Sequence, residues 1–537
     1  MVLKFEKFFK DPVHRHIGVT KTEIKFIDDN PWVQRLRRIH HLALCKLVYT
    51  GTNHSRFDHS LGTMYIMTKI IETLHNRSDE FNRLINKINI KRSKKEDKYT
   101  ALLKNMRIVA LIHDIGHYPF SHPLEEVIYS LLRNPFILEE KDRILLSKLL
   151  ENNKPHEIAS FFIYWSHLAK RLNDLGYDER FVCCVLHYNI ILEVIKNKEI
   201  QKIINDLHNI DLHSIINYLK QHDTQIKFLH KLIDGDFDAD RIDNLVRDSY
   251  YSGVGYGSID IERLLNNIHV VKKKREYILA FNVRTQGELE RFFNARYYIY
   301  RHVYHHHKVA LFDEAIKRLV IELINIDETT RNMFLNFTLG KMSEEEAILF
   351  DDFTILSKIY NYKDYFQRDL ILRSFYEVIL KRKDRFISIW KRDYDYIDIV
   401  GEKKKEAIIN AKIKQYMRHY QDLSTSISIY LEEKIKKATQ INIDIVISIK
   451  DFKAVPEEVY VLIREKGKIC KPLKKISSQI LGISECMKYK PVFYLYGVCD
   501  KCFIEKIRED RKQYLREEFT KSILPALEEI FDISTST

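Results

Sequence analysis

Residues 113–122 constrain this chain more than any other segment. Three histidines and one aspartate fall within these ten residues, at His113, Asp114, His117 and His122. The segment directly follows the apolar run 108–112, whose composition predicts a buried helix. A rigid element is therefore expected to present a His-Asp pair at its end.

The residue types of this segment favour a divalent metal. Neutral imidazole and carboxylate together suit Fe, Mn, Zn, Ni or Mg better than they suit metals that prefer thiolate. If the helix continues past His113, His117 lies one turn further on and both face one cavity. Gly116 and Pro119 then end the helix and aim His122 elsewhere. A lone histidine is usually structural, but this grouping is hard to explain by packing alone.

Further metal ligands must come from distant segments. His59 stands just before residues 61–74, an amphipathic helical pattern. Asp240 lies within residues 234–244, a run that contains five acids. So many carboxylates beside apolar neighbours favour cation binding, with an exposed acidic turn as the simpler alternative. An EF-hand calcium loop is excluded because the closing glutamate is missing.

Helix is expected to dominate the fold, because the chain has only 15 Gly and 10 Pro. Helical periodicity covers residues 34–44, 61–74, 102–113, most of 139–251, 286–324 and 343–437. The polar, Lys-rich stretch 75–100 is expected to form loops or exposed helix ends.

A few segments are strand-like instead. Residues 269–271 and 277–281 flank a basic turn and resemble a β-hairpin. Three more strands are expected at residues 441–449, 459–463 and 492–496. We therefore predict a mainly α fold, with a core over residues 1–330, a helical extension over 331–440 and a small α+β lobe over 441–537.

The composition is that of a globular protein, and we expect it in the cytoplasm without a membrane partner. Of its 537 residues, 45% are hydrophobic and 30% are charged. The chain contains no apolar run near the ~18 residues that span a bilayer, and its first residues lack the apolar core of a secretory signal. Seven cysteines in so long a chain do not form a disulfide framework.

The net charge of +13 favours a polyanionic partner, either a nucleoside triphosphate or a weakly bound nucleic acid. Lys-rich helices also often carry only a solvated face, so the charge alone does not decide. Cys499 and Cys502 have the spacing of a zinc-ligand pair. No second Cys or His pair stands at zinc-finger distance from them.

Several ordered segments resemble the HD-superfamily deoxynucleoside triphosphate triphosphohydrolases, which include bacterial dGTPase-like enzymes and the vertebrate sterile-alpha-motif HD enzyme. The likeness comprises residues 11–14, 29–37, 56–62, 113–122, 156–157, 240–248 and 295–304. It weakens through the C-terminal lobe. The resemblance implies that the predicted core is an HD-domain helical core.

The resemblance also implies roles for the metal-site residues. One divalent transition metal, Fe, Mn, Zn or Ni, would be held by His59, His113, Asp114 and Asp240. The α-phosphate would be surrounded by His117, His122 and His156, with His122 protonating the leaving 5′ oxygen. Mg²⁺ would accompany the nucleotide.

The substrate contacts follow in the same way. The triphosphate would be held by Arg56, Arg241 and Arg296, where the family commonly has Lys in place of Arg241. The sugar would be contacted by Tyr304 and Asp248, and the base by His41 and Leu42. Asn244 replaces a tyrosine of the vertebrate enzyme.

In activated members of this family, nucleotides bound between subunits order a tetramer. The matching positions for a GTP or dGTP activator and a second nucleotide are Asp29, Gln34, Arg37, Asp260, Arg263, His307 and Lys308. The resemblance thus implies a homo-oligomer, either a dimer or a tetramer. Lys10 stands in place of an asparagine, and an additional histidine precedes Lys308. An ordinary surface or helix-capping role is the alternative for these side chains.

The resulting expectation is a metal-dependent enzyme that hydrolyses deoxynucleoside triphosphates to deoxynucleoside and triphosphate. A second hypothesis keeps the metal site but assigns another nucleotide or a nucleic-acid end as substrate, as in HD-type phosphodiesterases. A third is a basic nucleic-acid-binding protein with a vestigial site. The full set of four metal-ligand positions disfavours this third hypothesis.

Overall fold

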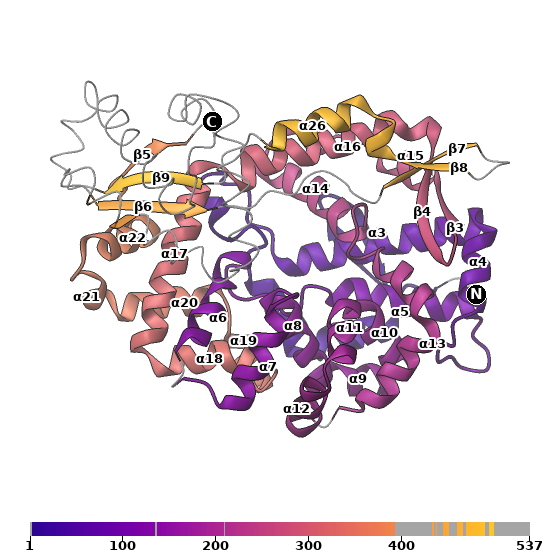
Figure 1. The fold of residues 1–537 in the computed structure, drawn as a ribbon, viewed down its shortest axis with the longest axis horizontal. Helices are drawn as coiled ribbons and strands as arrows, with labels where there is room; N and C mark the ends of the chain where they lie inside the picture. Colours follow the sequence, from indigo (N-terminus) through magenta and orange to yellow (C-terminus); the bar gives the residue numbers. More distant parts are fainter. Residues whose placement is uncertain are drawn as a thin grey trace, which may run out of the picture. The chain divides into compact units, whose positions relative to one another are not determined.

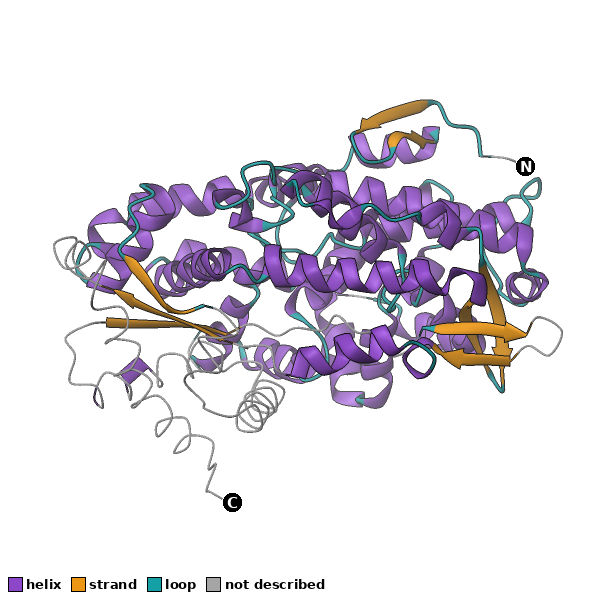
Figure 2. Ribbon diagram, turned by 90° about the horizontal axis from the view of Figure 1, so that it is seen from above, coloured by secondary structure: helices purple, strands orange, loops and turns teal. Residues whose placement is uncertain are grey.

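The computed structural model of this chain is mainly helical, with small β-sheets, which confirms the expected fold class (Figures 1 and 2). It describes residues 3–134, 137–208, 210–391, 432–433, 437, 444–449, 459–464, 469–488 and 493–498. The first of its two compact units comprises Met1–Ile299, Asp327–Ile355 and Pro456–Ile480. The second comprises Tyr300–Ile326, Leu356–Val455 and Leu481–Thr537. The units alternate along the chain, so the expected segment boundaries at 330 and 440 stay predictions.

The first unit is built around α3 (Arg56–Arg77), α5 (Lys98–Ile112) and α14 (Ala239–Ser252), with α3 packed against both others. Helix α5 is apolar on every side along residues 108–112, all of which are fully buried. A helix that is hydrophobic all round belongs in the middle of a core. The expected helices at 61–74 and 102–113 are thereby confirmed.

Further helices surround this centre in the first unit. They are α1 (Lys21–Asp28), α2 (Pro31–Arg35), α4 (Asp79–Asn86), α6 (Glu126–Arg133), α7 (Glu140–Leu150), α8 (Pro155–Ile163), α9 (Ala169–Asp174), α10 (Glu179–Leu186), α11 (Tyr188–Lys196), α12 (Lys198–His208), α13 (Leu212–His230), α15 (Ile261–Leu265), α16 (Gln286–Ile299), α18 (Glu328–Thr338) and α19 (Glu344–Leu349). Helix α4 lies within the polar stretch 75–100 and buries Phe81, Leu84 and Ile85. That stretch therefore contains a packed amphipathic helix as well as loops.

The helix ends that carry the motifs are fixed by capping. Ser55 accepts a hydrogen bond from the backbone of Asp58, whose carboxylate accepts from the backbone of Ser55 in return. This capping box satisfies donors that a helix start leaves unpaired. Asp238 caps α14 through the backbone N–H of Arg241, and Gly253 ends α14 at a φ of 74°. Both starts place a motif residue in the first helical turn.

The expected helix at residues 34–44 was wrong. Helix α2 ends at Arg35, and the 3₁₀ turns Leu36–Arg38 and Ala43–Leu47 follow. Between them, His40 pairs with Ser55 in a β-bridge, and the backbone N–H of Arg56 donates to the Ile39 carbonyl at 3.0 Å. Tertiary hydrogen bonds here replace the helical ones that the apolar spacing suggested.

Three other helical expectations require correction, one of them because strand β5 (Phe386–Trp390) lies within the expected helical stretch 343–437. The helix expected at 286–324 is interrupted, because α16 ends at Ile299 and the π-helical turn Tyr300–Tyr304 precedes α17 (His307–Ile326). Helix α5 ends at Ile112, so His113 and His117 are not successive turns of one helix. The turn that follows places both imidazoles beside Asp114 Oδ1, with His113 Nε2 at 3.3 Å and His117 Nε2 at 3.2 Å.

Two sheets belong to the first unit. Strands β1 (Lys7–Asp11) and β2 (Arg15–Val19) form an antiparallel hairpin that the sequence analysis missed. Strands β3 (Ile268–Lys273), β4 (Glu276–Asn282), β7 (Tyr460–Arg464) and β8 (Ile469–Pro472) form a four-stranded sheet in that order. The β3–β4 hairpin confirms the predicted strand pair. Lys274 supplies the positive φ of 56° at its turn.

The second unit contains α17, α21 (Lys363–Phe366), α22 (Leu370–Leu380) and a sheet of β5 (Phe386–Trp390), β9 (Phe493–Val498) and β6 (Asp444–Ile449). Helices α20 (Asp352–Asn361) and α26 (Ser478–Lys488) contribute residues to both units. All three C-terminal strands expected from the sequence are present, divided between two sheets. Cys499 and Cys502 lie outside the described residues, and none of the described helices is long and apolar enough to cross a membrane.

Candidate metal centre

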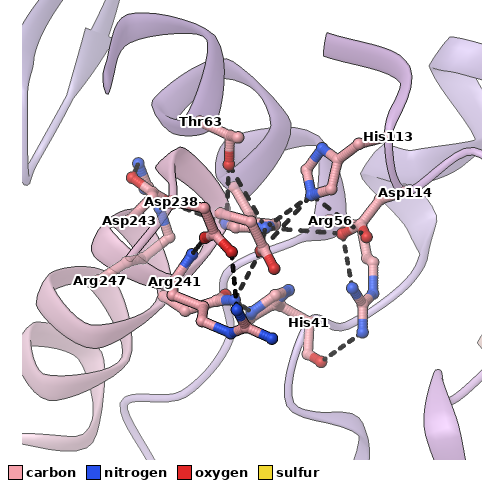
Figure 3. Close-up of polar contacts among 12 residues, drawn as sticks. His41, Arg56, Thr63, His113, Asp114, Asp238, Arg241, Asp243 and Arg247 are labelled. Atoms are coloured by element: carbon pink, nitrogen blue, oxygen red, sulfur yellow. Dashed lines mark hydrogen bonds and ion pairs between the residues drawn. The ribbon is translucent and has the colours of Figure 1, made fainter. Parts of the chain in front are cut away.

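Side chains from three helices of the first unit converge on one point (Figure 3). His59 comes from the first turn of α3, His113 from the end of α5, and Asp240 from the first turn of α14. The Nε2 atom of His59 lies 3.2 Å from Nε2 of His113 and 2.9 Å from Oδ1 of Asp240. Asp114 adds a carboxylate oxygen 3.7 Å from His59 Nε2. The structure thus brings together all four side chains expected to hold a metal.

The outer nitrogens of the two histidines fit a metal site. His59 Nδ1 hydrogen-bonds to Oδ2 of Asp243 at 2.8 Å, and His113 Nδ1 to the Ala110 carbonyl at 2.7 Å. An acceptor on Nδ1 fixes the tautomer and leaves Nε2 free for a cation. Burial opposes charge on His59, but Asp240 and Asp243 outweigh it and raise its pKa to about 10. The surrounding carboxylates therefore favour positive charge at this point.

Asp243 is the centre of the network behind His59, although no role was predicted for it from the sequence. It accepts hydrogen bonds from Nε of Arg247 at 2.8 Å, and it lies 2.6 Å from Nε2 of His14. Gly62 faces it so closely that a Cβ there would collide with the Asp243 carboxylate and the Arg247 guanidinium. The available signal was the spacing, since Asp243 follows Asp240 by one helical turn.

Arg56 reaches the centre from beside His59. Its Nη1 donates to Oδ2 of Asp114 at 2.5 Å, and its Nε donates to Ser121 Oγ at 2.9 Å. Burial raises the pKa of Asp114, but Arg56, His113 and His117 outweigh it and hold that pKa well below its usual value. Arg56, expected at the triphosphate, is thus buried against a carboxylate of the metal centre (Figure 3).

A second cluster lies on the other side of Asp114. His117 Nε2 is 3.2 Å from Asp114 Oδ1, and its ring stacks on that of His156 at 4.2 Å. The Glu125 carboxylate lies 2.6 Å from His122 Nδ1, with which it hydrogen-bonds, and 2.9 Å from His156 Nδ1. The three histidines expected around a phosphate are therefore gathered, by a glutamate that the sequence analysis did not single out.

The backbone before His122 is strained. Phe120 and Ser121 have φ values of 56° and 58°, a region that residues with a Cβ seldom occupy. The strain is held by hydrogen bonds: Asp352 accepts from the Phe120 backbone at 2.6 Å, and Ser121 Oγ accepts from Arg56. The His122 side chain is 64% exposed, whereas its partner Glu125 is buried. Such strain commonly marks a functional site.

Residues expected at the base and sugar form a neighbouring polar group. His41 Nε2 hydrogen-bonds to Asn244 Oδ1 at 2.6 Å, and Asn244 Nδ2 donates to Asp240 Oδ1 at 2.7 Å. Asp248 pairs with His54 Nε2 at 2.8 Å. Asn244 therefore links His41 to a metal-centre carboxylate. Leu42 is half-buried next to His41.

The other three residues expected to contact the triphosphate or the sugar are Arg241, Arg296 and Tyr304. Arg241 Nη1 donates to Asp238 Oδ2 at 3.0 Å and keeps 28% of its side chain exposed. Arg296 is buried in α16. Tyr304 ends the π-helical turn of the second unit, where its ring packs edge-on against Tyr300. Their contacts with a nucleotide stay predictions.

The positions expected to bind an activator lie in three places. Arg37 Nε donates to Gln34 Oε1 at 2.9 Å and its guanidinium lies 3.6 Å from the Phe57 ring centroid, while Asp29 is exposed at the end of α1. Asp260 caps α15 by accepting from the Arg263 backbone at 2.9 Å. His307 and Lys308 begin α17 in the second unit. This capping hydrogen bond gives Asp260 a structural role that needs no bound nucleotide.

Residues 56–210 match the family model of the HD domain. The chain contains an HD domain. This domain implies a divalent metal, and it includes His59, His113 and Asp114 of the centre just described. Asp240 is contributed by α14, beyond the matched residues.

The chain is similar to proteins from archaea, viruses and animals. It is 28% identical over 349 residues to an uncharacterised protein of Methanocaldococcus jannaschii, covering 63% of this chain and 57% of that one. A putative HD domain-containing protein of Acanthamoeba polyphaga mimivirus is 27% identical, covering 62% and 61%. The deoxynucleoside triphosphate triphosphohydrolase SAMHD1 of Danio rerio is 28% identical, covering 56% and 42%. The matches thus span less than two thirds of each of these relatives.

One solved structure supports the fold around the HD domain. A phosphohydrolase from Bacteroides thetaiotaomicron superposes with a TM-score of 0.52 at 18% identity, covering 92% of this chain and 100% of that one. At this identity the likeness concerns the fold alone.

Proposed function

We propose that this chain is a metal-dependent phosphohydrolase that converts deoxynucleoside triphosphates to deoxynucleoside and triphosphate. The observation that carries the proposal is the position of Asp114 between two clusters. Its Oδ1 lies 3.3 Å from His113 Nε2 in the metal centre and 3.2 Å from His117 Nε2 in the second cluster. A site with a cation on one side and a group of histidines on the other suits phosphoryl transfer to water.

The proposed metal ligands are His59, His113, Asp114 and Asp240. A bound divalent ion supplies Lewis acidity, which makes water nucleophilic near neutral pH. Asp243 would hold the His59 ring in place, and Arg56 would hold the Asp114 carboxylate. A water would attack the α-phosphorus, and the bond from phosphorus to the 5′ oxygen would break.

The proposed acid is His122. Its Nδ1 is held by Glu125, so Nε2 is the nitrogen left to deliver a proton to the departing 5′ oxygen. Burial lowers the pKa of His122, and Glu125 opposes that shift because its carboxylate favours the protonated imidazole. His117 and His156 would contact the α-phosphate oxygens. Charge that develops in the transition state would meet these preorganised donors.

Substrate recognition is assigned to the polar group beside the centre. Asp248, oriented by His54, would accept a hydrogen bond from the sugar. The contact of Tyr304 with the 2′ carbon is assigned from the family resemblance alone. His41 and Leu42 would face the base. Arg241 and Arg296 would hold the triphosphate, and the positive net charge of the chain would attract it.

The proposal includes control by a second nucleotide in a homo-oligomer. Its support is the family resemblance at the positions expected to bind an activator. Arg37 is exposed, donates to the amide of the half-buried Gln34 and covers the buried Phe57 ring. An exposed cation beside an amide suits the phosphates of a nucleotide.

Product analysis tests the proposal directly. The protein would be incubated with each dNTP and NTP, with and without GTP or dGTP, in Mg²⁺ or Mn²⁺, and the products separated by ion-exchange chromatography. Deoxynucleoside and triphosphate in a 1:1 ratio are expected, and H113A, which removes a metal ligand, should form neither. Monophosphate and pyrophosphate would instead assign a different bond. Salt-sensitive binding of single strands without any hydrolysis would assign a nucleic-acid-binding function.

A further inference from the structure

We propose that His117, His122, Glu125 and His156 form a second divalent-cation site, suited to Zn²⁺ and separate from the centre at His59, His113 and Asp240. One ligand atom from each of the four side chains lies within 4.8 Å of the other three. Three imidazoles and one carboxylate are a donor set that Zn²⁺ binds readily in proteins.

The distances within this cluster suit a shared ion. The Nδ1 atoms of His122, His156 and His117 all face the Glu125 carboxylate, at 2.6, 2.9 and 3.9 Å. Ligands about 2.0–2.1 Å from a tetrahedral zinc lie about 3.3 Å from one another. The observed separations bracket that value, so small side-chain adjustments would admit the ion.

The cluster also contains nitrogens with unmet bonding capacity. His117 Nδ1 and His156 Nδ1 are buried, and neither makes a hydrogen bond with any residue that the structure describes. His156 Nδ1 lies 2.9 Å from Glu125 Oε2, as an ion pair. Buried polar atoms are normally satisfied, so two such atoms directed at one carboxylate point to a missing cation.

The surrounding backbone holds the four side chains in position. Gly116 lies so close to the His156 carbonyl and the Ser160 backbone that a Cβ would collide with both. This contact brings the turn carrying His117 onto the start of α8, which carries His156. On the other side, the strained residues Phe120 and Ser121 orient His122. A site preorganised in this way loses little freedom when it binds an ion.

Occupation of the second site would have a consequence for hydrolysis, and this step rests on the proposed function. An ion on His122 Nδ1 would displace the hydrogen bond to Glu125 and place positive charge beside the proposed acid. Binding of Zn²⁺ at this cluster would therefore inhibit hydrolysis, whereas the ion at the metal centre supports it.

The ligand assignment is tested by counting bound metal, which does not depend on activity. The purified protein would be equilibrated with Zn²⁺, and total transition metal per chain measured by mass spectrometry, with affinities from competition against a chromophoric chelator. Two ions per chain are expected. H122N should lower the affinity for the second ion by more than the roughly 10- to 100-fold that is typical when a hydrogen-bond partner of a metal ligand is lost. The side chain of His122 is 64% exposed, so this variant should fold.

Three further variants separate the two sites. E125Q should lose the second ion. H113A should bind the first ion more weakly and retain the second. H16N, a change at an exposed histidine of β2, should bind two ions. Circular dichroism would confirm that each variant is folded. One ion per chain in the unmodified protein, or two in both H122N and E125Q at unchanged affinity, would overturn the assignment. Absence of triphosphate among the products would overturn the proposed function and leave the second site standing.

Discussion

The Nδ1 atom of His59 lies 2.8 Å from the Asp243 carboxylate, and both groups are fully buried. The same carboxylate accepts from Arg247, whose Nη1 donates to Asp11 at 2.7 Å. A chain of buried charges therefore runs from the metal centre to the N-terminal hairpin. One aspartate thus links the metal centre to the ion pair between Arg247 of α14 and Asp11 of β1.

Replacing that aspartate should affect metal binding and stability together. In D243N, His59 loses its anionic partner, and metal affinity should fall by about 10- to 100-fold. Arg247 loses the charge of Asp243, one of its two buried carboxylate partners, which should cost about 3–5 kcal/mol of unfolding free energy. Metal retention during dialysis and denaturation in urea measure the two effects. D28N is the control, because the exposed pair of Asp28 with Lys7 contributes at most about 1 kcal/mol. Equal effects in both variants would refute the assigned role.

Gly62 offers a second test of the same network. A Cβ at this position would overlap the Asp243 carboxylate and the Arg247 guanidinium, so G62A should force them apart. We expect a loss of about 1–3 kcal/mol, together with weaker metal binding. G287A is the matched control, since Gly287 lies in helix α16 with open space around its Cβ position. That variant should be stabilised by about 0.5–1 kcal/mol, and a stable, metal-replete G62A would contradict the account.

Much of this arrangement could be predicted from local sequence. The sequence indicates α3 and α5 correctly. The apolar positions of residues 61–74 have helical spacing, and the apolar stretch 102–113 is too long for a typical strand. The alternation in 277–281 likewise indicates β4. The residue types of the motifs indicate a metal before any geometry is known, and the match to the HD domain agrees with them.

The failures have a common physical cause, which is contact between residues distant in sequence. The spacing of residues 34–44 favours a helix, but Arg35 donates to the Phe350 carbonyl and His40 to Asp352, more than 300 residues away. Hydrogen bonds of this kind leave no local pattern. Glu125 and Asp243 were missed for the same reason, because their partners come from other segments. Only their spacing from His122 and Asp240 hinted at a shared site.

His122 should control the rate of hydrolysis without controlling the metal centre. Its ring belongs to the second cluster, so H122A should retain the ion at His59 and His113 while turnover falls by about 10²- to 10⁴-fold, the usual contribution of a general acid. Steady-state kinetics and metal analysis of the Mn²⁺-loaded protein measure the two quantities. A substrate analogue with a good leaving group at the α-phosphorus should restore much of the rate. Loss of the metal-centre ion, or no rescue by such a leaving group, would remove His122 from the role of acid.

His187 should make the first unit sensitive to acid. It packs edge-on against Phe161 and Tyr164, and burial, assisted by His230, lowers its pKa to about 3. In the unfolded chain the imidazole titrates near pH ~6.5, so between these values the unfolded state binds the extra proton. Stability is therefore lost as pH falls below about 6.5, by about 2 kcal/mol between pH 7 and pH 5 for this single group. H187Q should lose that much less stability over this interval in urea titrations, whereas H16Q, at an exposed site, should match the unmodified protein. An unchanged pH dependence in H187Q would show that His187 is not the group responsible.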